Sequence, residues 1–308
     1  MKTARVALVT GAAGFVGGHL ARRLLAGGWE THAIVRPSSN ATTLCGLLGS
    51  DSVHVHDGST AGLVDIVRSA RPDIVFHLAS VFVAEHRADD VDPLIRSNVL
   101  FGVQLLEAMT VVGVSDIVNT GSYSQHYEGR AYSPVSLYAA TKHAFQDILQ
   151  FYCEVRGLRA VTLELPDTYG PDDKRPKLLS LLARAARTGE TLQMSPGEQL
   201  LDLLHVDDVS HGYQVAADGL LTGQLPSPSG YRLSSGSLVR LKDVVELYRQ
   251  ATGHSVSVAW GGRPYRAREV MEPVSPVPVL PEWQPCIRLK DGLVALEAES
   301  QEDADGNR

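Results

Sequence analysis

The chain has 308 residues and a mass of 33.2 kDa, which is enough for one or two domains with a full hydrophobic core. Hydrophobic residues make up 44% and charged residues 20%, which excludes a disordered chain. The 28 Lys and Arg against 35 Asp and Glu give a net charge of −7, so neither a nucleic acid nor a membrane is expected as partner. Three distant cysteines argue against a disulfide framework and a zinc site, and no targeting signal or apolar run of membrane-spanning length is evident. We therefore expect a cytoplasmic protein.

Short β-branched apolar runs alternate with segments of helical spacing in the first half of the chain. Strands are expected at residues 5–10, 31–35, 53–56, 73–78, 116–120 and 160–165, and helices at Phe15–Ala26, 63–69, 94–109 and 135–156. This alternation predicts an α/β fold with a doubly wound parallel sheet of the Rossmann type and right-handed crossovers.

After Gly170 the pattern loosens and prolines interrupt it. Helices are still expected at residues 178–187 and at Leu241–Thr252, and an irregular surface segment at 272–284. We divide the chain into a Rossmann domain at 1–170, a smaller C-terminal α/β lobe at 171–296, from which the chain can return to the sheet, and a disordered acidic tail at 297–308.

A glycine-rich loop, TGAAGFVG, stands between the first strand and the first helix. Gly11 permits the tight turn, Gly14 lets the backbone approach a diphosphate, and Gly17 lets the helix pack on the sheet. Phe15 and Val16 open a helix whose N–H groups face that diphosphate. The alternative is a strand–helix turn without a ligand, but the context favours a dinucleotide.

The residue at the end of the second strand, where an acidic side chain would read a ribose, is Arg36. Its guanidinium offers donors to a 2′-phosphate, and Ser39 nearby can add another, so NADP(H) is favoured over NAD(H). An arginine in solvent is the alternative. Asp57, followed by Gly58, is placed to accept a hydrogen bond from the adenine amino group, although a turn aspartate is nearly as good a reading.

Tyr138 and Lys142 form a YxxxK motif at the start of a long helix, where the spacing puts both side chains on one face. The ammonium can lower the pKa of the phenol and hold a ribose. Ser122 follows the fifth strand and can share a substrate oxygen with Tyr138, unless it is only a turn serine. Thr120 and Ser124 are weaker candidates. The histidines are scattered, so no metal is expected.

These motifs, together with HLAS after the fourth strand and LLHVDDV later, resemble the extended short-chain dehydrogenase/reductases over residues 4–295. Within that family, three segments are most similar to 4-ketoreductases of nucleoside-diphosphate 6-deoxyhexoses, the CDP-abequose synthase type. The segments are PVSLYAATKHAFQDIL, DTYGPDDKRPKLL and WQPCIRLKDGL.

The resemblance implies that Ser122 polarises the sugar carbonyl, Tyr138 transfers the proton and Lys142 supports both tyrosine and ribose. It also implies that Asn98 braces the active-site backbone and that the chain passes the nicotinamide at Pro166. Substrate contacts are expected from Ser122, Asp167, Lys177 and Arg266, with Arg263 and Arg268 close behind and Lys174 and Arg175 in the same loop as Lys177. The cofactor-binding residues are expected to be Gly11, Gly14, Phe15, Val16, Gly17, Arg36, Ser39, Asp57, Gly58, Leu78, Ala79, Ser80, Asn98, Tyr138, Lys142 and Pro166.

Departures from the family pattern narrow the range of expected activities. The 4,6-dehydratases carry Asp-Glu after the active-site hydroxyl, whereas this chain has Tyr123 and Ser124, so water elimination ranks low. A nucleotide-sugar 4-epimerase with tightly held NAD stays open, but Arg36 indicates exchangeable NADPH and a ketoreductase. A silent NADP-binding regulator and a reductase of non-sugar carbonyls are further alternatives. A homodimer through a four-helix bundle of residues 94–109 and 135–156 is also expected.

Overall fold

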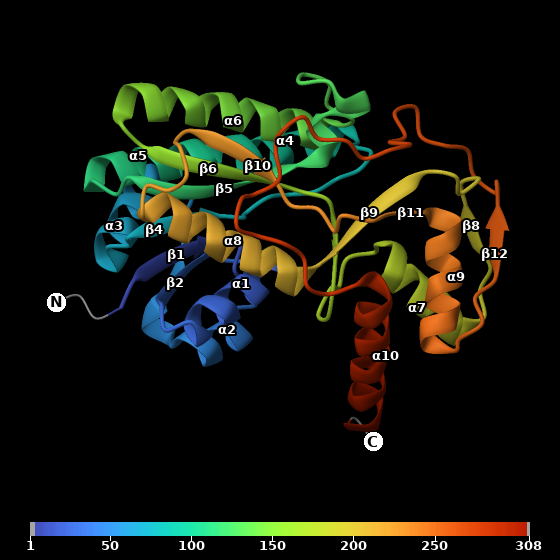
Figure 1. Ribbon diagram of the computed structural model, residues 1–308. Helices are drawn as coiled ribbons and strands as arrows, with labels where there is room; N and C mark the ends of the chain where they lie inside the picture. Colours follow the sequence, from blue (N-terminus) through green and yellow to red (C-terminus); the bar gives the residue numbers. More distant parts are fainter. Residues whose placement is uncertain (1–3, 307–308) are drawn as a thin grey trace.

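The computed structural model describes residues 4–306 of the chain, and it is built around a parallel sheet of seven strands (Figure 1). The strands run in the order β10-β6-β5-β4-β1-β2-β3, so the chain proceeds from β1 to one edge and then from β4 to the other. Their bounds are β1 Val6–Thr10, β2 Glu30–Val35, β3 Val53–Val55, β4 Ile74–His77, β5 Asp116–Ser122, β6 Arg159–Leu165 and β10 Ser229–Arg232. The doubly wound parallel sheet is confirmed.

Helices cover both faces of this sheet, as the alternating sequence pattern requires (Figure 1). One face packs on α3 (Thr60–Ala70), α5 (Phe101–Val112) and α6 (Leu137–Arg156) through a core that includes Leu8, Leu105 and Phe145. The other face packs on α1 (Phe15–Ala26), α2 (Thr42–Leu48) and α8 (Val206–Leu221), with Val9, Leu20 and Tyr213 buried between them. The strands are apolar on both sides because both faces are covered.

A smaller lobe follows the sheet and has its own apolar core, which includes Leu182, Val244 and Leu293. Its helices are α7 (Leu178–Thr188), α9 (Leu241–Thr252) and α10 (Leu289–Gly306), and its strands are β7 (Asp167–Tyr169), β8 (Leu192–Met194), β9 (Leu200–His205), β11 (Leu238–Arg240) and β12 (Val258–Trp260). Strand β9 lies between β7 and β11, and β12 pairs with β8. Between β9 and β11 the chain returns to the main sheet, where β10 forms an edge strand and α8 packs on one face.

Two segments differ from the sequence-based expectations. The stretch 272–284 is irregular as predicted, but it is not all surface, because Leu280 and Trp283 are buried against the main core. Helix α10 runs to Gly306, so residues 297–306 are helical where the sequence predicts a disordered tail. The helix starts on the apolar core at Leu289 and Leu293, and its Glu- and Ala-rich continuation has good helix propensity. Residues 307 and 308 lie outside the described part.

A continuous helical run precedes β5. It comprises the 3₁₀ turn Ala88–Asp90, α4 (Val91–Ile95), a π-helical stretch at Arg96–Leu100 and α5. By length and composition alone residues 88–112 are apolar enough to cross a membrane, contrary to the expectation from sequence. Leu105, Leu106 and Met109 in this run are fully buried on the sheet, whereas 33% of its most apolar 18-residue window is buried in all.

Candidate active site

The carboxyl ends of β1 and β4 are neighbours at the point where the strand order reverses, the usual ligand site of open α/β sheets. The glycine loop leaves β1 there. Gly11 has a φ of +74°, and a Cβ on Gly17 would lie 2.2 Å from the Gly11 carbonyl oxygen. No side chain caps α1 at Gly14, and its first turn holds no acidic residue. This loop fits a dinucleotide diphosphate, because the first N–H groups of the helix are free to bind an anion.

Thr10 ties the two strand ends together beneath that loop. Its hydroxyl oxygen accepts hydrogen bonds from the backbone N–H groups of Leu78 and Ala79, each at 3.1 Å, and lies 3.0 Å from His77 Nδ1. A Cβ on Gly11 would approach Ala79 N to 2.8 Å. The HLAS segment is therefore pressed against the glycine loop, which places Leu78, Ala79 and Ser80 beside the dinucleotide cradle.

The residues expected at the adenosine end lie at the tips of β2 and β3. Arg36 directly follows β2 and is exposed, and the Ser39 N–H donates to its carbonyl oxygen at 2.9 Å. Asp57 is also exposed; its carboxylate accepts hydrogen bonds from the N–H and the hydroxyl of Ser59, both at 2.8 Å, which lower its pKa. Gly58 follows with a φ of +92°. Arg36 is thus free to meet a ligand, whereas Asp57 already caps a turn.

Two serine hydroxyls meet at the end of β5. Ser122 is the last residue of the strand, and its Oγ lies 2.7 Å from Oγ of Ser124. Thr120 faces the other way: its hydroxyl donates to the His77 carbonyl oxygen at 2.8 Å and lies 2.6 Å from the buried Tyr213 hydroxyl. Ser122 and Ser124 therefore share the site, and Thr120 belongs to the sheet.

Tyr138 and Lys142 lie on the first turns of α6, over the end of β5. Burial raises the pKa of Tyr138 to about 12, while hydrogen bonds with Ser122 and Ser80 oppose that shift. The buried Lys142 ammonium donates to the Thr120 carbonyl oxygen at 3.1 Å, and burial lowers its pKa to about 8. The phenol, both serines and the ammonium therefore converge at one point of the carboxyl edge.

Asn98, in the π-helical stretch, connects the chain after β4 to α6. Its side-chain oxygen accepts from the Ser80 hydroxyl at 3.1 Å and the Val81 N–H at 2.8 Å, and its amide donates to the Thr141 hydroxyl at 2.9 Å. Only 2% of Asn98 is exposed. π-Helical turns often mark functional sites, and this one turns an amide onto the backbone beside Tyr138.

Phe82 forms one wall of the site, although no motif in the sequence marks it. The ring is 49% exposed and meets Tyr138 edge-to-face, with ring centroids 4.9 Å apart. The Lys177 ammonium lies 4.5 Å from the centre of the same ring and donates to Asp167 Oδ1 at 3.1 Å. Asp167 and Lys177 thus lie at the mouth of the site beside an exposed aromatic face.

A loop from the second lobe reaches back over the glycine loop. Arg175 holds Asp173 with two hydrogen bonds of 2.7 Å, and its guanidinium lies 4.7 Å from the centre of the Phe15 ring. Pro166 is half-buried at the end of β6. Arg266 is exposed, and its Nε lies 3.9 Å from Glu85 Oε1 in the loop after β4. Arg268 instead donates to the Ser133 hydroxyl and covers Tyr127, so of the two arginines Arg266 is the freer.

Among the residues the structure describes, no group of three or more His, Cys, Asp or Glu side chains is arranged to hold a metal ion.

The fold and this site define a nicotinamide-dinucleotide-dependent enzyme of the oxidoreductase type. The chain belongs to the NAD dependent epimerase/dehydratase family, whose model matches residues 7–224. It is 26% identical to a CDP-abequose synthase of Salmonella muenchen over 86% of this chain and 87% of that protein. It is 30% identical to a UDP-glucose 4-epimerase of Mycolicibacterium smegmatis over 75% and 76% of the two chains. A UDP-glucose 4-epimerase of Brucella ovis solved with NAD has the same fold, with a TM-score of 0.83 at 22% identity over 96% of this chain and 98% of that one.

The contacts of several residues of the site could not be predicted from the sequence. Thr10 and Phe82 stand in apolar surroundings that suggest core positions, and only the fold turns them to the site. Glu164 did carry a signal, since a carboxylate inside the apolar run AVTLEL requires a buried partner.

Proposed function

We propose that this protein is an NADPH-dependent 4-ketoreductase of a nucleoside-diphosphate 4-keto-6-deoxyhexose, an enzyme of deoxysugar biosynthesis. The observation that carries the proposal is the hydrogen bond between the Ser122 and Tyr138 hydroxyls, with Lys142 nearby. These groups lie at the carboxyl edge of the sheet, where the glycine loop begins. The similarity to a CDP-abequose synthase over most of both chains supports a nucleotide sugar as the substrate.

The chain's own groups suit the reduction of a carbonyl. Ser122 donates a hydrogen bond to the carbonyl oxygen, with Ser124 orienting its hydroxyl. Tyr138 delivers the proton to that oxygen; with a pKa near 12 it stays protonated at neutral pH and can act as an acid. Lys142 keeps a positive charge beside the phenol. The bound nicotinamide would supply the hydride.

A reductase needs an external hydride donor, and Arg36 supports NADPH in that role. Its guanidinium is exposed at the tip of β2, where it can meet a 2′-phosphate without giving up a partner among residues 4–306. The sugar nucleotide would lie between the main sheet and the smaller lobe. We assign Lys177 with Asp167, and the exposed Arg266, to the substrate, because each of these side chains faces the mouth of the site or remains exposed.

The proposal is tested by mixing the purified protein with NADPH and following NADPH absorbance. We expect oxidation only after a CDP-, dTDP- or GDP-linked 4-keto-6-deoxyhexose is added. Tyr138→Phe should lower kcat about a hundredfold to ten-thousandfold and leave NADPH affinity unchanged. No oxidation with any of the three nucleotides would remove the proposal.

The second candidate is a nucleotide-sugar 4-epimerase with tightly held NAD, which the relationship to the UDP-glucose 4-epimerase of M. smegmatis favours. Denaturing the protein as purified and identifying the released cofactor separates the two. Stoichiometric NAD favours the epimerase, whereas an empty protein or exchangeable NADP favours the reductase. A silent NADP-binding regulator would instead retain its full cellular effect in the Tyr138→Phe variant.

We further propose a cytoplasmic homodimer. Apolar side chains remain 42–62% exposed on α4, α5 and α6, on the helices that the four-helix bundle would use. They are Val91, Ile95, Val111, Phe151 and Val155, and Leu100 lies in the π-helical stretch between α4 and α5. Sedimentation should give twice the chain mass, and Phe151→Glu should give the single chain.

A further inference from the structure

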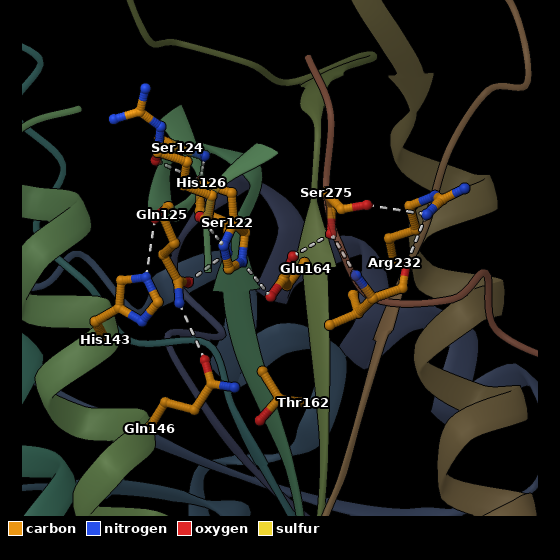
Figure 2. A network of polar contacts seen from close by, with 12 residues as sticks. Ser122, Ser124, Gln125, His126, His143, Gln146, Thr162, Glu164, Arg232 and Ser275 are labelled. Carbon is orange, nitrogen blue, oxygen red and sulfur yellow. Dashed lines mark hydrogen bonds and ion pairs between the residues drawn. The ribbon is translucent and has the colours of Figure 1, made fainter. Parts of the chain in front are cut away.

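A buried ion pair between His126 and Glu164 lies close to Ser122 (Figure 2). His126 follows Ser122 by four residues and is 6% exposed, and Glu164 on β6 is 1% exposed. His126 Nε2 and Glu164 Oε1 are 2.8 Å apart. Neither residue has a part in the proposed proton transfer, and a buried carboxylate requires a reason to be retained.

The geometry determines the charge of the histidine. Its Nδ1 lies 3.2 Å from the Arg130 carbonyl oxygen, so both ring nitrogens face acceptors. With Glu164 ionised, both acceptors need a proton from the ring, so His126 is then an imidazolium paired with a carboxylate. Burial alone would lower the pKa of His126, but the hydrogen bond and the charge of Glu164 raise it above its ordinary value.

The other oxygen of Glu164 binds the returning C-terminal segment. It accepts from the Ser275 hydroxyl at 2.6 Å. Arg232, the register partner of Glu164 on β10, donates to the carbonyl oxygens of Ser275 and Val277 at 3.1 and 2.6 Å. One carboxylate thus joins the chain after Ser122 to β6 and to the irregular segment 272–284.

Gln125 anchors the same stretch of chain to α6. Its side-chain oxygen accepts from the Ser122 N–H at 2.8 Å, and its amide donates to Gln146 at 3.0 Å. The His143 Nε2–H donates to the Gln125 carbonyl oxygen at 2.9 Å. Figure 2 shows Gln125 reaching toward α6 and His126 toward Glu164, so two successive residues hold the chain beyond Ser122 from opposite sides.

We propose that His126 and Glu164 are positioning residues for Ser122. Their ion pair holds the turn after β5 against β6, and so fixes the position of the Ser122 hydroxyl, which hydrogen-bonds the substrate oxygen. This inference rests on the proposed role of Ser122. Removing one charge would leave the other buried and unpaired, and the turn would shift. A displacement of about 1 Å at a reacting group can cost roughly a hundredfold in rate.

Other charged groups around the pair do not replace it. His143 on α6 meets the His126 ring edge-to-face at 5.3 Å, but its Nε2 is engaged by Gln125. Arg268 covers Tyr127, the next residue, and binds Ser133. The charge that shifts the Tyr138 pKa is that of Arg175, and burial lowers the Lys142 pKa. Besides His126, Glu164 acts on Tyr123: its charge adds to the burial that raises the pKa of this tyrosine, whose hydroxyl donates to the Leu233 carbonyl oxygen.

The test is a double-mutant cycle of His126→Gln, Glu164→Gln and the double variant, with His32→Gln as control. His32 is another half-buried, hydrogen-bonded histidine, near the start of β2 and away from the site. With NADPH and the 4-keto sugar nucleotide we expect each single variant to lower kcat about tenfold to a hundredfold. KM and NADPH affinity should change less than twofold, and the double variant should be no slower than the singles, because the pair acts as one unit.

Nitrogen-15 histidine NMR provides a readout that needs no substrate. In the wild type the His126 ring, assigned by its loss in His126→Gln, should show two protonated nitrogens at neutral pH, and in Glu164→Gln only one. Unchanged kcat, multiplicative effects in the double variant or a neutral His126 ring would each overturn the inference. If the wild type reduced none of the sugars, the proposed function would fail, and the inference would be tested by the NMR spectrum and by amide hydrogen exchange. We then expect faster exchange at residues 122–130 in both single variants but not in His32→Gln. Unchanged exchange in the single variants would overturn the inference.

Discussion

The hydroxyl oxygens of Ser122 and Ser124 lie 2.7 Å apart at the tip of β5. Ser122 must donate to a substrate oxygen in the proposed reduction, and Ser124 can accept or donate to keep that hydroxyl in place. The hydrogen-bond partner of the Ser122 hydroxyl is thus only two residues away, on the turn that the His126–Glu164 ion pair connects to β6.

Removing the two serine hydroxyls one at a time distinguishes a direct contact with the substrate oxygen from a role in orienting Ser122. Ser122→Ala should lower kcat about a hundredfold to a thousandfold, as expected for one donor to a developing oxyanion. Ser124→Ala should cost about tenfold, because Ser122 keeps its hydroxyl but loses its orienting partner. Steady-state rates with the 4-keto substrate check this order, and an equal loss in both variants would contradict it.

Arg36 should determine the coenzyme. Arg36→Glu replaces a donor to the 2′-phosphate by a group that repels it and suits a ribose hydroxyl. We expect kcat/KM for NADPH relative to NADH to fall about tenfold to a hundredfold, since hydrogen bonds to charged groups contribute about 1.5–3 kcal/mol. Arg68→Glu, on the exposed face of α3, is the matched control. A ratio that stays constant in Arg36→Glu would place the arginine outside the site.

Asn98 should matter for stability as well as for rate. Asn98→Ala leaves the Val81 N–H and the Thr141 hydroxyl without their buried partner. The free energy of unfolding should drop by about 1–3 kcal/mol in urea titrations. Asn40→Ala, which removes an exposed side chain that caps Thr42, should cost far less. Equal losses would show that Asn98 is not a brace.

Phe82 should affect substrate binding more than chemistry. Phe82→Ala removes the exposed ring beside Tyr138, so KM for the sugar nucleotide should rise about tenfold while NADPH affinity stays unchanged. Phe82→Leu, which keeps an apolar surface, should recover part of that loss. A KM unaffected by either change would show that the sugar does not reach this wall.

The pH dependence should follow Lys142. Burial lowers its pKa from the ordinary lysine value to about 8, so the ammonium is present below pH 8 and is lost above it. Tyr138, with a pKa near 12, stays protonated over the same range. Reduction should therefore fall about tenfold per pH unit above pH 8, measured as kcat/KM. A flat profile up to pH 10 would contradict the assignment.

Much of this protein could be predicted from sequence because its signals are local. The β-branched run before TGAAGFVG, the helix Phe15–Ala26 and the YxxxK spacing depend only on neighbours along the chain. Since parallel strands end at a common edge, the order of strands and helices was enough to predict the meeting of Ser122, Tyr138 and Lys142.

Only the tertiary structure decided the contacts between distant segments. No local pattern marks the ring of Phe82. Thr10 opens the TGAAGFVG motif and Glu164 stands in an apolar run, but neighbouring residues do not show which groups these two side chains meet. Each of them acquires its partner through packing between segments far apart in the sequence. The same reason explains the short strands of the second lobe, which pair with segments tens of residues away, and the burial of Trp283 in a stretch predicted to lie at the surface. Local propensity sets which elements form, whereas the free energy of burying polar and apolar groups together sets what each side chain meets.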